Sequence, residues 1–314
     1  MGKFKSAEEA AAAGEPLVVR VPPRLGAMTR RTKESLVYAP AIEISKKTKF
    51  GEVPKIVGDK FAAKLYSRQY TLQSGSVPLS IVVTGLGFSR DALSIALSLP
   101  NDVSLAFSPY APELKDQLLL VRQSGHEAWA QIPAQNADYP ATDPGPLGQI
   151  ASLSASASSD RMMEWMALTH GVVGGIFSPD ETLSEFGSAM KRPLNMLAEH
   201  GLMALFTEPA RARQLPPMPR DLLAKVGDLY IDGTTSRAAA NSQLRGLLEA
   251  TQQEGNYILV VEATPHMLRL LKTWCEQLPE VSPVKLAPLS ALYLDQRARD
   301  AKEAAEAAEA AQEQ

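Results

Sequence analysis

The sequence predicts an α/β protein, an irregular (β/α) barrel of seven or eight units with an extended N-terminal arm and a helical C-terminal tail. Short apolar runs alternate with helical patterns from about residue 78 to residue 293. Repeated strand–helix alternation is typical of a parallel sheet covered by helices, and the number of repeats favours a barrel over an open doubly wound sheet. The segments before and after this region lack the alternation.

The expected strands are short runs rich in aliphatic and β-branched residues. They are residues 79–84, 103–107, 127–132, 172–177, 202–206, 228–232, 257–262 and 284–287. The expected helices are residues 89–98, 112–124, 158–170, 180–200, 219–226, 236–253 and 265–278. The chain therefore divides into an arm (1–75), a barrel (76–293) and a charged Ala/Glu helical tail (294–314). A long loop at 132–157 is expected to be functional or an insertion.

Composition is that of a soluble globular protein, with 45% hydrophobic and 21% charged residues in a chain of 314. The sequence contains no run of about 18 apolar residues, so it predicts no transmembrane helix. The first residues, MGKFKSAEEAAAAGEP, lack the apolar core of a secretory signal. The single cysteine, Cys275, lies in the helical pattern LLKTWCEQL, which favours a buried structural thiol over a nucleophile.

Charge is distributed unevenly. Residues 1–75 hold 14 Lys and Arg against 7 Asp and Glu, whereas the rest of the chain holds 18 against 28. A basic arm on an acidic body suits a protein partner, an anionic surface or self-association, and it equally suits an arm that is only solvated. Aromatic residues are not interleaved with the basic ones, so nucleic acid is not an expected partner.

The stretch IVVTGLGFSRDA at residues 81–92 has the form of a strand, a glycine turn and a helix start. A dinucleotide-binding loop needs a third small residue, and Arg90 stands at that position. The expected strand carboxyl ends, where barrel enzymes carry their chemistry, include Thr84, Gly85, Gln131–Gln135, Gly174, Gly175, Thr207, Glu208, Asp232 and Glu262. This set holds no histidine. Its three acids leave open a hard metal ion or a glycosidase pair, which nothing in their spacing requires.

Several segments together resemble the divergent polysaccharide deacetylase family of bacteria. They are KFGEVPKIVGDK, IVVTGLGFSRDA, VSLAFSPYAPEL, GHEAWAQIPAQ, DYPATDPGPLG, GVVGGIFSPDETL and VKLAPLSALY. The resemblance runs from about Ile42 to Leu292 and implies a deformed (β/α) barrel of the polysaccharide deacetylase type. It also implies metal-assisted attack of water on an acetamide, with an Asp pair at the first strand end and histidines at later ones.

The positions that match these metal ligands carry other residues here. The Asp pair matches Thr84 and Gly85, a histidine segment matches Gly174–Phe177, a late Gly-His-Pro matches 261–263, and a Glu matches Gln135. Glycine offers no side-chain donor. The degenerate site positions are therefore Thr84, Gly85, Gln135, Gly175 and Glu262, and we predict no metal, no cofactor and no catalysis.

We predict a catalytically inactive structural or interaction subunit of a larger assembly that binds its partner, or itself, through residues 1–75. The first alternative is binding of a polysaccharide such as peptidoglycan. Its cleft candidates, with Trp129 nearby, are Gln131, Gln135, Tyr139, Asp143, Thr207, Asp232 and Glu262, although Asp143-Pro-Gly-Pro is also a plain turn. The second alternative is residual hydrolysis at Glu208, Asp232 and Glu262. The resemblance implies the cell envelope or periplasm, but the chain shows no signal or anchor, so its compartment stays open.

Overall fold

The computed structural model describes residues 35–73, 75–136, 138–178, 183–207, 217–251, 255–278 and 283–297. Residues 1–34 of the predicted arm and residues 298–314 of the predicted tail lie outside these ranges, as does Glu208. Among the described residues, no helix is both long and apolar enough to span a membrane.

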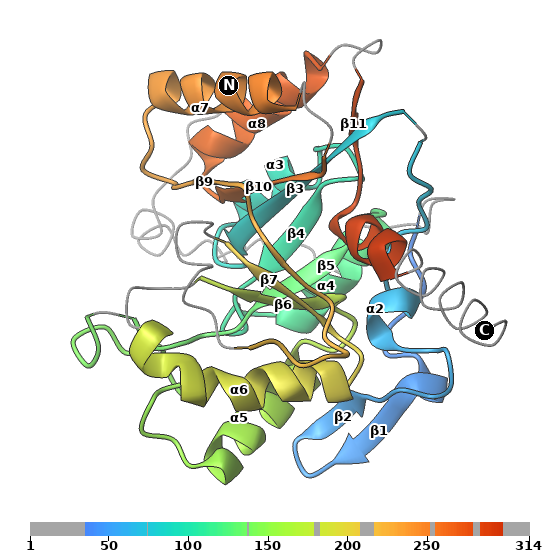
Figure 1. Cartoon of the computed structure of the whole chain (residues 1–314), viewed down its shortest axis with the longest axis vertical. Coiled ribbons are helices and arrows are strands. Elements are labelled where there is room, and N and C mark those ends of the chain that lie inside the picture. The colour runs from blue at the N-terminus through green and yellow to red at the C-terminus, as the bar shows by residue number, and fades with distance from the viewer. Residues whose placement is uncertain are drawn as a thin grey trace, which may run out of the picture.

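The core is a curled parallel sheet alternating with helices, which confirms the predicted α/β fold (Figure 1). The strands are β3 (Val77–Leu86), β4 (Ser104–Phe107), β5 (Ala128–Gln131), β6 (Gly174–Phe177), β7 (Met203–Phe206), β8 (Ala224–Val226), β9 (Leu229–Ile231), β10 (Tyr257–Glu262) and β11 (Val284–Leu286). Their order is β8-β7-β6-β5-β4-β3-β10-β9, with β11 also paired to β3. All eight expected strands are present.

In the described part of the chain, six helices connect the strands. They are α3 (Arg90–Ala96), α4 (Leu114–Gln123), α5 (Ala155–Leu168), α6 (Leu183–Glu199), α7 (Arg237–Ala250) and α8 (Pro265–Glu276). Each corresponds to an expected helix. The side chains that α8 buries, such as Met267, Leu268 and Leu271, are spaced as on one helical face.

The expected helix at 219–226 is wrong, because its second half forms strand β8 and lies at the end of the sheet. Sheet pairing overrides the good helix formers in DLLAKV: Ala204 and Leu205 of β7 pair with Ala224 and Lys225. Two residues then carry the chain to the other end of the sheet. Gly227 donates its N–H to Phe206 O at 2.8 Å, and Asp228 donates to Ile258 O, also at 2.8 Å. The segment β8–β9 therefore links β7 to β10 and draws the two ends of the sheet together.

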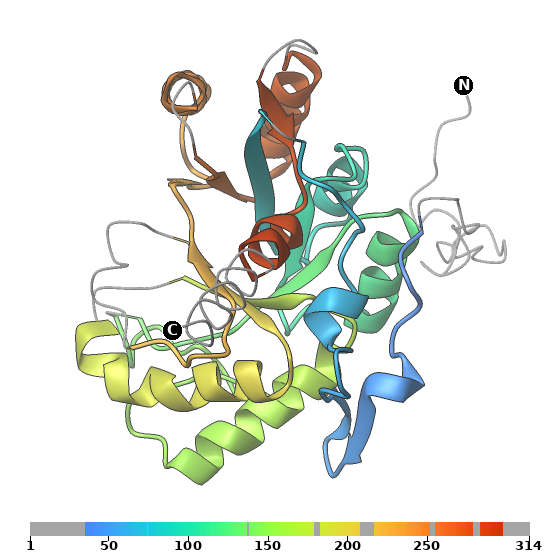
Figure 2. The same ribbon diagram turned by 45° about the vertical axis from the view of Figure 1, so that its right-hand side comes forward.

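Residues 35–72 lie against the barrel and contain a short 3₁₀ helix (Ile42–Ile44), a hairpin of β1 (Ser45–Thr48) and β2 (Gly51–Pro54), and a helical turn α2 (Ala62–Leu65). The hairpin lies beside α5 (Figure 2). Buried Arg122 of α4 fastens this segment: its guanidinium donates to Val37 O at 2.6 Å and to Tyr66 O at 2.9 Å. Burial lowers the pKa of Arg122 to about 10.

Residues 289–297 form a helix that closes the amino-terminal end of the curled sheet and crosses the predicted boundary at 293/294. Its contacts reach the neighbouring strands β7 and β8. The Tyr293 hydroxyl donates to Ala204 O of β7 at 2.7 Å, and Lys225 Nζ of β8 donates to Gln296 Oε1 at 2.7 Å. The helix therefore covers the amino-terminal end of this part of the sheet.

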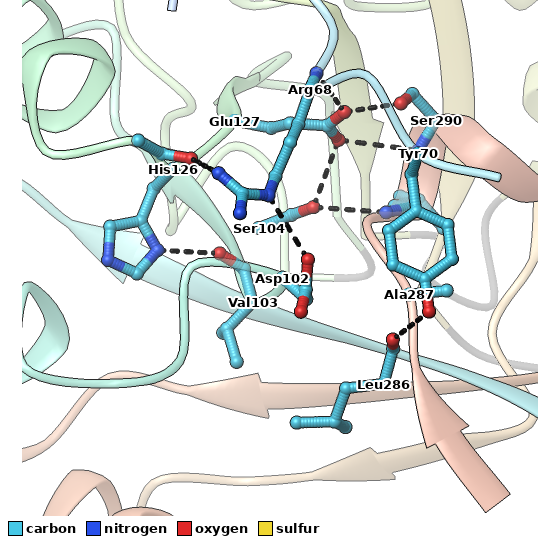
Figure 3. A network of polar contacts seen from close by, with 12 residues as sticks. Arg68, Tyr70, Asp102, Val103, Ser104, His126, Glu127, Leu286, Ala287 and Ser290 are labelled. Atoms are coloured by element: carbon cyan, nitrogen blue, oxygen red, sulfur yellow. Dashed lines mark hydrogen bonds and ion pairs between the residues drawn. The ribbon is translucent and has the colours of Figure 1, made fainter. Parts of the chain in front are cut away.

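Glu127, which precedes β5 and is fully buried, joins this helix to the sheet (Figure 3). Its Oε1 accepts from Arg68 N–H at 2.9 Å and from the Ser290 hydroxyl, and its Oε2 accepts from the Ser104 hydroxyl at 3.2 Å and Ser290 N–H at 3.3 Å. Burial raises the pKa of Glu127, while the donors from Ser290 and Arg68 act in the opposite direction. One carboxylate thus ties together three segments distant in the sequence.

Candidate functional site

The candidate site is the edge where the carboxyl ends of the strands meet. At the end of β3, the hydroxyl of Thr84 is buried and finds no hydrogen-bond partner among the described residues. Gly85 and Gly87 follow with φ of +80° and +124°, a region that disfavours residues with a side chain. A Cβ at Gly87 would lie 2.3 Å from Ala111 Cβ. The Gly-Leu-Gly turn is therefore required for a tight strand-to-helix connection, and Ser89 then caps α3 by accepting from Ala92 N–H.

Glu262 stands beside this turn, because it pairs with Thr84 across β10 and β3. A Cβ at Gly85 would lie 3.6 Å from Glu262 Cγ. Glu262 Oε2 accepts from Gly233 N–H at 3.0 Å and from the Tyr230 hydroxyl at 3.5 Å. The carboxylate is thus engaged in holding the loop that follows β9.

Asp232 lies in that same loop and is exposed. Its Oδ1 accepts from the Thr234 hydroxyl and from Thr234 N–H, the latter at 2.6 Å. These hydrogen bonds lower the pKa of Asp232. The side chain forms a local turn, so the carboxylates of Asp232 and Glu262 both stabilise the loop backbone.

The cleft candidates on β5 and the following loop form a second group. Gln131 accepts the indole N–H of Trp165 with its backbone carbonyl at 2.8 Å, and Gln135 Oε1 accepts from Ala151 N–H at 3.0 Å. Asp143 Oδ1 accepts from Gly145 N–H at 2.8 Å, as in the plain turn that its sequence also suggests. Tyr139 is half-buried. Side-chain hydrogen bonds of Gln135 and Asp143 therefore serve the loop itself.

Gly174 and Gly175, at the start of β6, are closely surrounded by atoms of neighbouring residues. A Cβ at Gly175 would lie 2.3 Å from Ile132 Cδ1 and 3.4 Å from Trp165 Cη2. A Cβ at Gly174 would lie 2.4 Å from Met203 O, a backbone atom that has little freedom to move. The space that a side chain at position 175 would occupy is filled by apolar groups.

Thr207 follows β7, where its N–H donates to Phe177 O at 3.0 Å. Its hydroxyl is buried and, like that of Thr84, has no partner within the described parts of the chain. Native proteins pair most buried polar groups, so these two hydroxyls are exceptions. Sequence reasoning selected both residues for their strand-end positions, which the structure confirms.

Two aromatic residues at this edge were missed by the sequence reasoning. Phe88, directly after the glycine turn, is 65% exposed, and Tyr110, after β4, is 37% exposed. The Tyr110 hydroxyl donates to Pro144 O at 2.7 Å and accepts from Leu147 N–H at 3.0 Å, so it holds the long loop. For Phe88, the sequence did hold a signal, namely an aromatic residue directly after a strand-end glycine turn.

Cavities lie elsewhere in the molecule. A cavity of about 800 Å³ is lined by residues near the amino ends of β7 and β8, and one of about 420 Å³ lies between the arm, α4 and α5. Two smaller ones have volumes of about 270 and 180 Å³. None of the strand-end residues named above lines any of these four cavities.

The curled α/β fold, with its strand-end loops, is that of a deacetylase-like protein. Residues 81–293 match the model of the divergent polysaccharide deacetylase family. The chain belongs to this family, as its sequence motifs predicted.

One solved structure supports the fold, and a second match is weaker. An uncharacterized protein of Agrobacterium tumefaciens, ATU2773, is 25% identical with a TM-score of 0.67 over 77% of this chain and 99% of its own. A protein of Enterococcus faecalis for which cellobiose-phosphate cleavage has been suggested is 10% identical, with a TM-score of 0.42 over 63% of this chain and 85% of its own. No curated protein matches the chain.

The donor set at the strand ends does not fit the metal ion that the family resemblance implies. Such a site takes imidazole and carboxylate ligands. Thr84, Gly85, Gln135 and Gly175 supply neither, and Glu262 is committed to Gly233. In the described ranges, no group of three or more His, Cys, Asp or Glu side chains is placed to hold a metal.

Proposed function

We propose that this chain is a non-catalytic member of its family and acts as an interaction subunit of a larger assembly. The observation that carries this proposal is the enclosure of Gly175. An imidazole at this position would require Ile132 to move, because Ile132 Cδ1 lies 2.3 Å from where a Cβ would be. The absence of a carboxylate at Thr84 and Gly85 supports the same conclusion.

The arm is the proposed partner-binding region. Its described part is anchored to the barrel, since Leu36 N–H donates to Arg122 O at 2.9 Å and Arg122 in turn donates to Val37 O. It nevertheless turns apolar side chains to the outside: Val37, Tyr38 and Ile42 are 49%, 56% and 90% exposed. Several such residues on one firmly held segment favour a protein contact.

The absence of catalysis is tested by incubating the full chain with oligomers of an N-acetylated amino sugar and an added divalent metal. We expect no acetate release above the protein-free control. We also expect less than one metal ion per chain after gel filtration. One bound metal per chain together with turnover contradicts the proposal and favours residual hydrolysis.

The interaction is tested by isolating the tagged full chain from its native host and asking whether a defined partner or a second copy accompanies it. Replacing the exposed arm residues Val37, Tyr38 and Ile42 by Ser should weaken the assembly, whereas removing all of 1–75 would also remove core contacts such as Arg68 N–H to Glu127 and Tyr66 O to Arg122. We expect a stable assembly with the full chain. A chain that is always monomeric and alone contradicts the proposal.

Carbohydrate binding is the second candidate, favoured by the exposed ring of Phe88 at the strand-end edge. Aromatic rings stack on sugar faces and contribute much of the contact area. Titration with N-acetylglucosamine oligomers, followed by ¹H–¹⁵N chemical shifts, should then move residues near Phe88. Phe88→Ala should abolish the shifts, whereas Leu168→Ala, an exposed residue on α5, should not.

A further inference from the structure

The cavity of about 800 Å³ lies at the amino-terminal end of the sheet, opposite the strand-end site. Leu202 and Leu223 directly precede β7 and β8, and Leu294 and Arg297 belong to the C-terminal helix. The arm, α6 and the segment at 219–221 supply the rest of the wall. The volume of this cavity is within the range of ligand sites in proteins.

This cavity is a groove, open on one side, and its apolar floor continues onto an apolar rim. Phe61 is 7% exposed in the floor, whereas Ile56 and the adjoining Val57 are 46% and 44% exposed at the rim. The guanidinium of Arg297 lies 4.8 Å from the centroid of the Phe61 ring. The groove therefore offers a half-open site for an apolar side chain, with a cation beside it.

Three cations and three acids line the groove, but ion pairing within the described residues leaves more of the cations than of the acids free. Lys64 is paired with Asp59 at 3.1 Å, and Glu199 with Arg192 at 3.2 Å. Among the described residues, the side chains of Arg220 and Arg297 have no carboxylate partner, and Asp221 is the one lining acid without a cation. Unpaired arginines beside an apolar floor suit a carboxylate-bearing occupant, because the guanidinium fork binds carboxylates in bidentate geometry.

Neither terminal segment of this chain combines a large apolar side chain with a surplus of carboxylates. Residues 298–314 hold 5 acids against 2 Lys and Arg, but they contain no Leu, Ile, Val, Met or aromatic residue to serve as an anchor. Residues 1–34 contain apolar side chains, but with 7 Lys and Arg against 4 acids they carry the wrong charge. The combination of an apolar anchor and carboxylates must come from elsewhere.

We propose that this groove is the docking site for a segment of another protein that presents a large apolar side chain flanked by Asp or Glu. The inference rests on the proposed interaction function and assigns it a surface and a partner chemistry. The apolar side chain fills the space between Ile56, Phe61 and Leu202. The flanking carboxylates pair with Arg220 and Arg297. Binding energy at such sites concentrates in a central apolar anchor and in arginines.

The test selects a displayed library of random 16-residue peptides on the immobilised full chain, with counter-selection on the bare support. Enriched peptides are expected to place Leu, Ile, Phe or Trp beside Asp or Glu. By fluorescence anisotropy, their affinity should fall at least about fivefold for Ile56→Ser and for Arg220→Gln, since truncating a hot-spot side chain costs more than about 1 kcal/mol.

Matched controls exist in the same chain. Leu168→Ser changes an exposed apolar residue at the end of α5, 37% exposed against 46% for Ile56, and Arg245→Gln changes an exposed arginine on α7. Both variants should bind the peptides like the wild type. Circular dichroism at pH 7 checks that all four variants are folded.

The inference is overturned if no peptide is enriched, if the enriched peptides are basic, or if their affinity does not depend on Ile56. So does self-association that is lost in Ile56→Ser, which would make a second copy the occupant. If a partner isolated from the native host stays bound to Ile56→Ser and Arg220→Gln, the groove assignment fails while the interaction function stands. A chain without any partner fails the proposed function itself.

Discussion

Replacing Glu127 by Gln tests the way the C-terminal helix is held. Each carboxylate oxygen accepts one backbone N–H and one hydroxyl: Oε1 from Arg68 and Ser290, Oε2 from Ser104 and Ser290. Hydroxyls rotate, but backbone N–H groups cannot. Whichever way the Gln amide is turned, its NH₂ faces one backbone N–H that then loses its acceptor.

The magnitude follows from these contacts. The bonds to Oε2 are the longer pair, at 3.2 and 3.3 Å, so the NH₂ should take that side and leave Ser290 N–H unpaired. A buried unpaired donor costs about 1–3 kcal/mol, and the bonds that remain lose their charge assistance. The lower desolvation of a neutral amide offsets part of this loss. We expect the free energy of unfolding to fall by about 2 kcal/mol.

Equilibrium urea unfolding of the full chain at pH 7, followed by far-ultraviolet circular dichroism, measures this change. Glu113→Gln is the control, because Glu113 is exposed and its nearest ion-pair contact, to Arg90, is 3.9 Å long. That variant should change stability by less than about 0.5 kcal/mol. Ser290→Ala should also be destabilising, and its combination with Glu127→Gln should be non-additive, since both residues belong to one hydrogen-bond network. If Glu127→Gln is as stable as the control, the carboxylate does not hold the helix.

Three further predictions concern other buried groups. Gly175→Ala should destabilise by about 1–3 kcal/mol through overlap with Ile132, and Ile132→Ala should relieve part of that loss in a double-mutant cycle; simple additivity would contradict the filled site. Burial lowers the pKa of His200, whose Nδ1 donates to Pro54 O at 2.5 Å. Because the native state then binds fewer protons than the unfolded state, stability should fall as the pH drops below about 6.5. His200→Asn should flatten this dependence in urea unfolding from pH 7.5 to 5, whereas His266→Asn, at an exposed site, should not. Burial raises the pKa of Cys275 to about 12, so Ellman's reagent should react with it only in denaturant; fast labelling of the folded chain would refute this.

Local sequence patterns predicted most of the framework. Each expected strand was a short run of β-branched and aliphatic residues, and each true helix had an apolar face with a 3.6-residue period, both of which are properties of neighbouring residues. The strand ends of Thr84, Gln131, Thr207 and Glu262 followed from the same pattern. Among the described residues, 219–226 were assigned a helix where part of the stretch forms a strand, because a partner strand distant in the sequence decides between the two.

The sequence by itself determined the α/β class, the family and the replacement of the metal-ligand positions by Thr, Gly and Gln, since these depend on residue type and order. The tertiary structure alone decided what occupies the vacated space: Ile132 against Gly175, and Gly233 against Glu262. It also placed Glu127 among donors from residues 68, 104 and 290. Such contacts join residues tens to hundreds of positions apart, and a pattern read along the chain holds no information about which of them become neighbours in space.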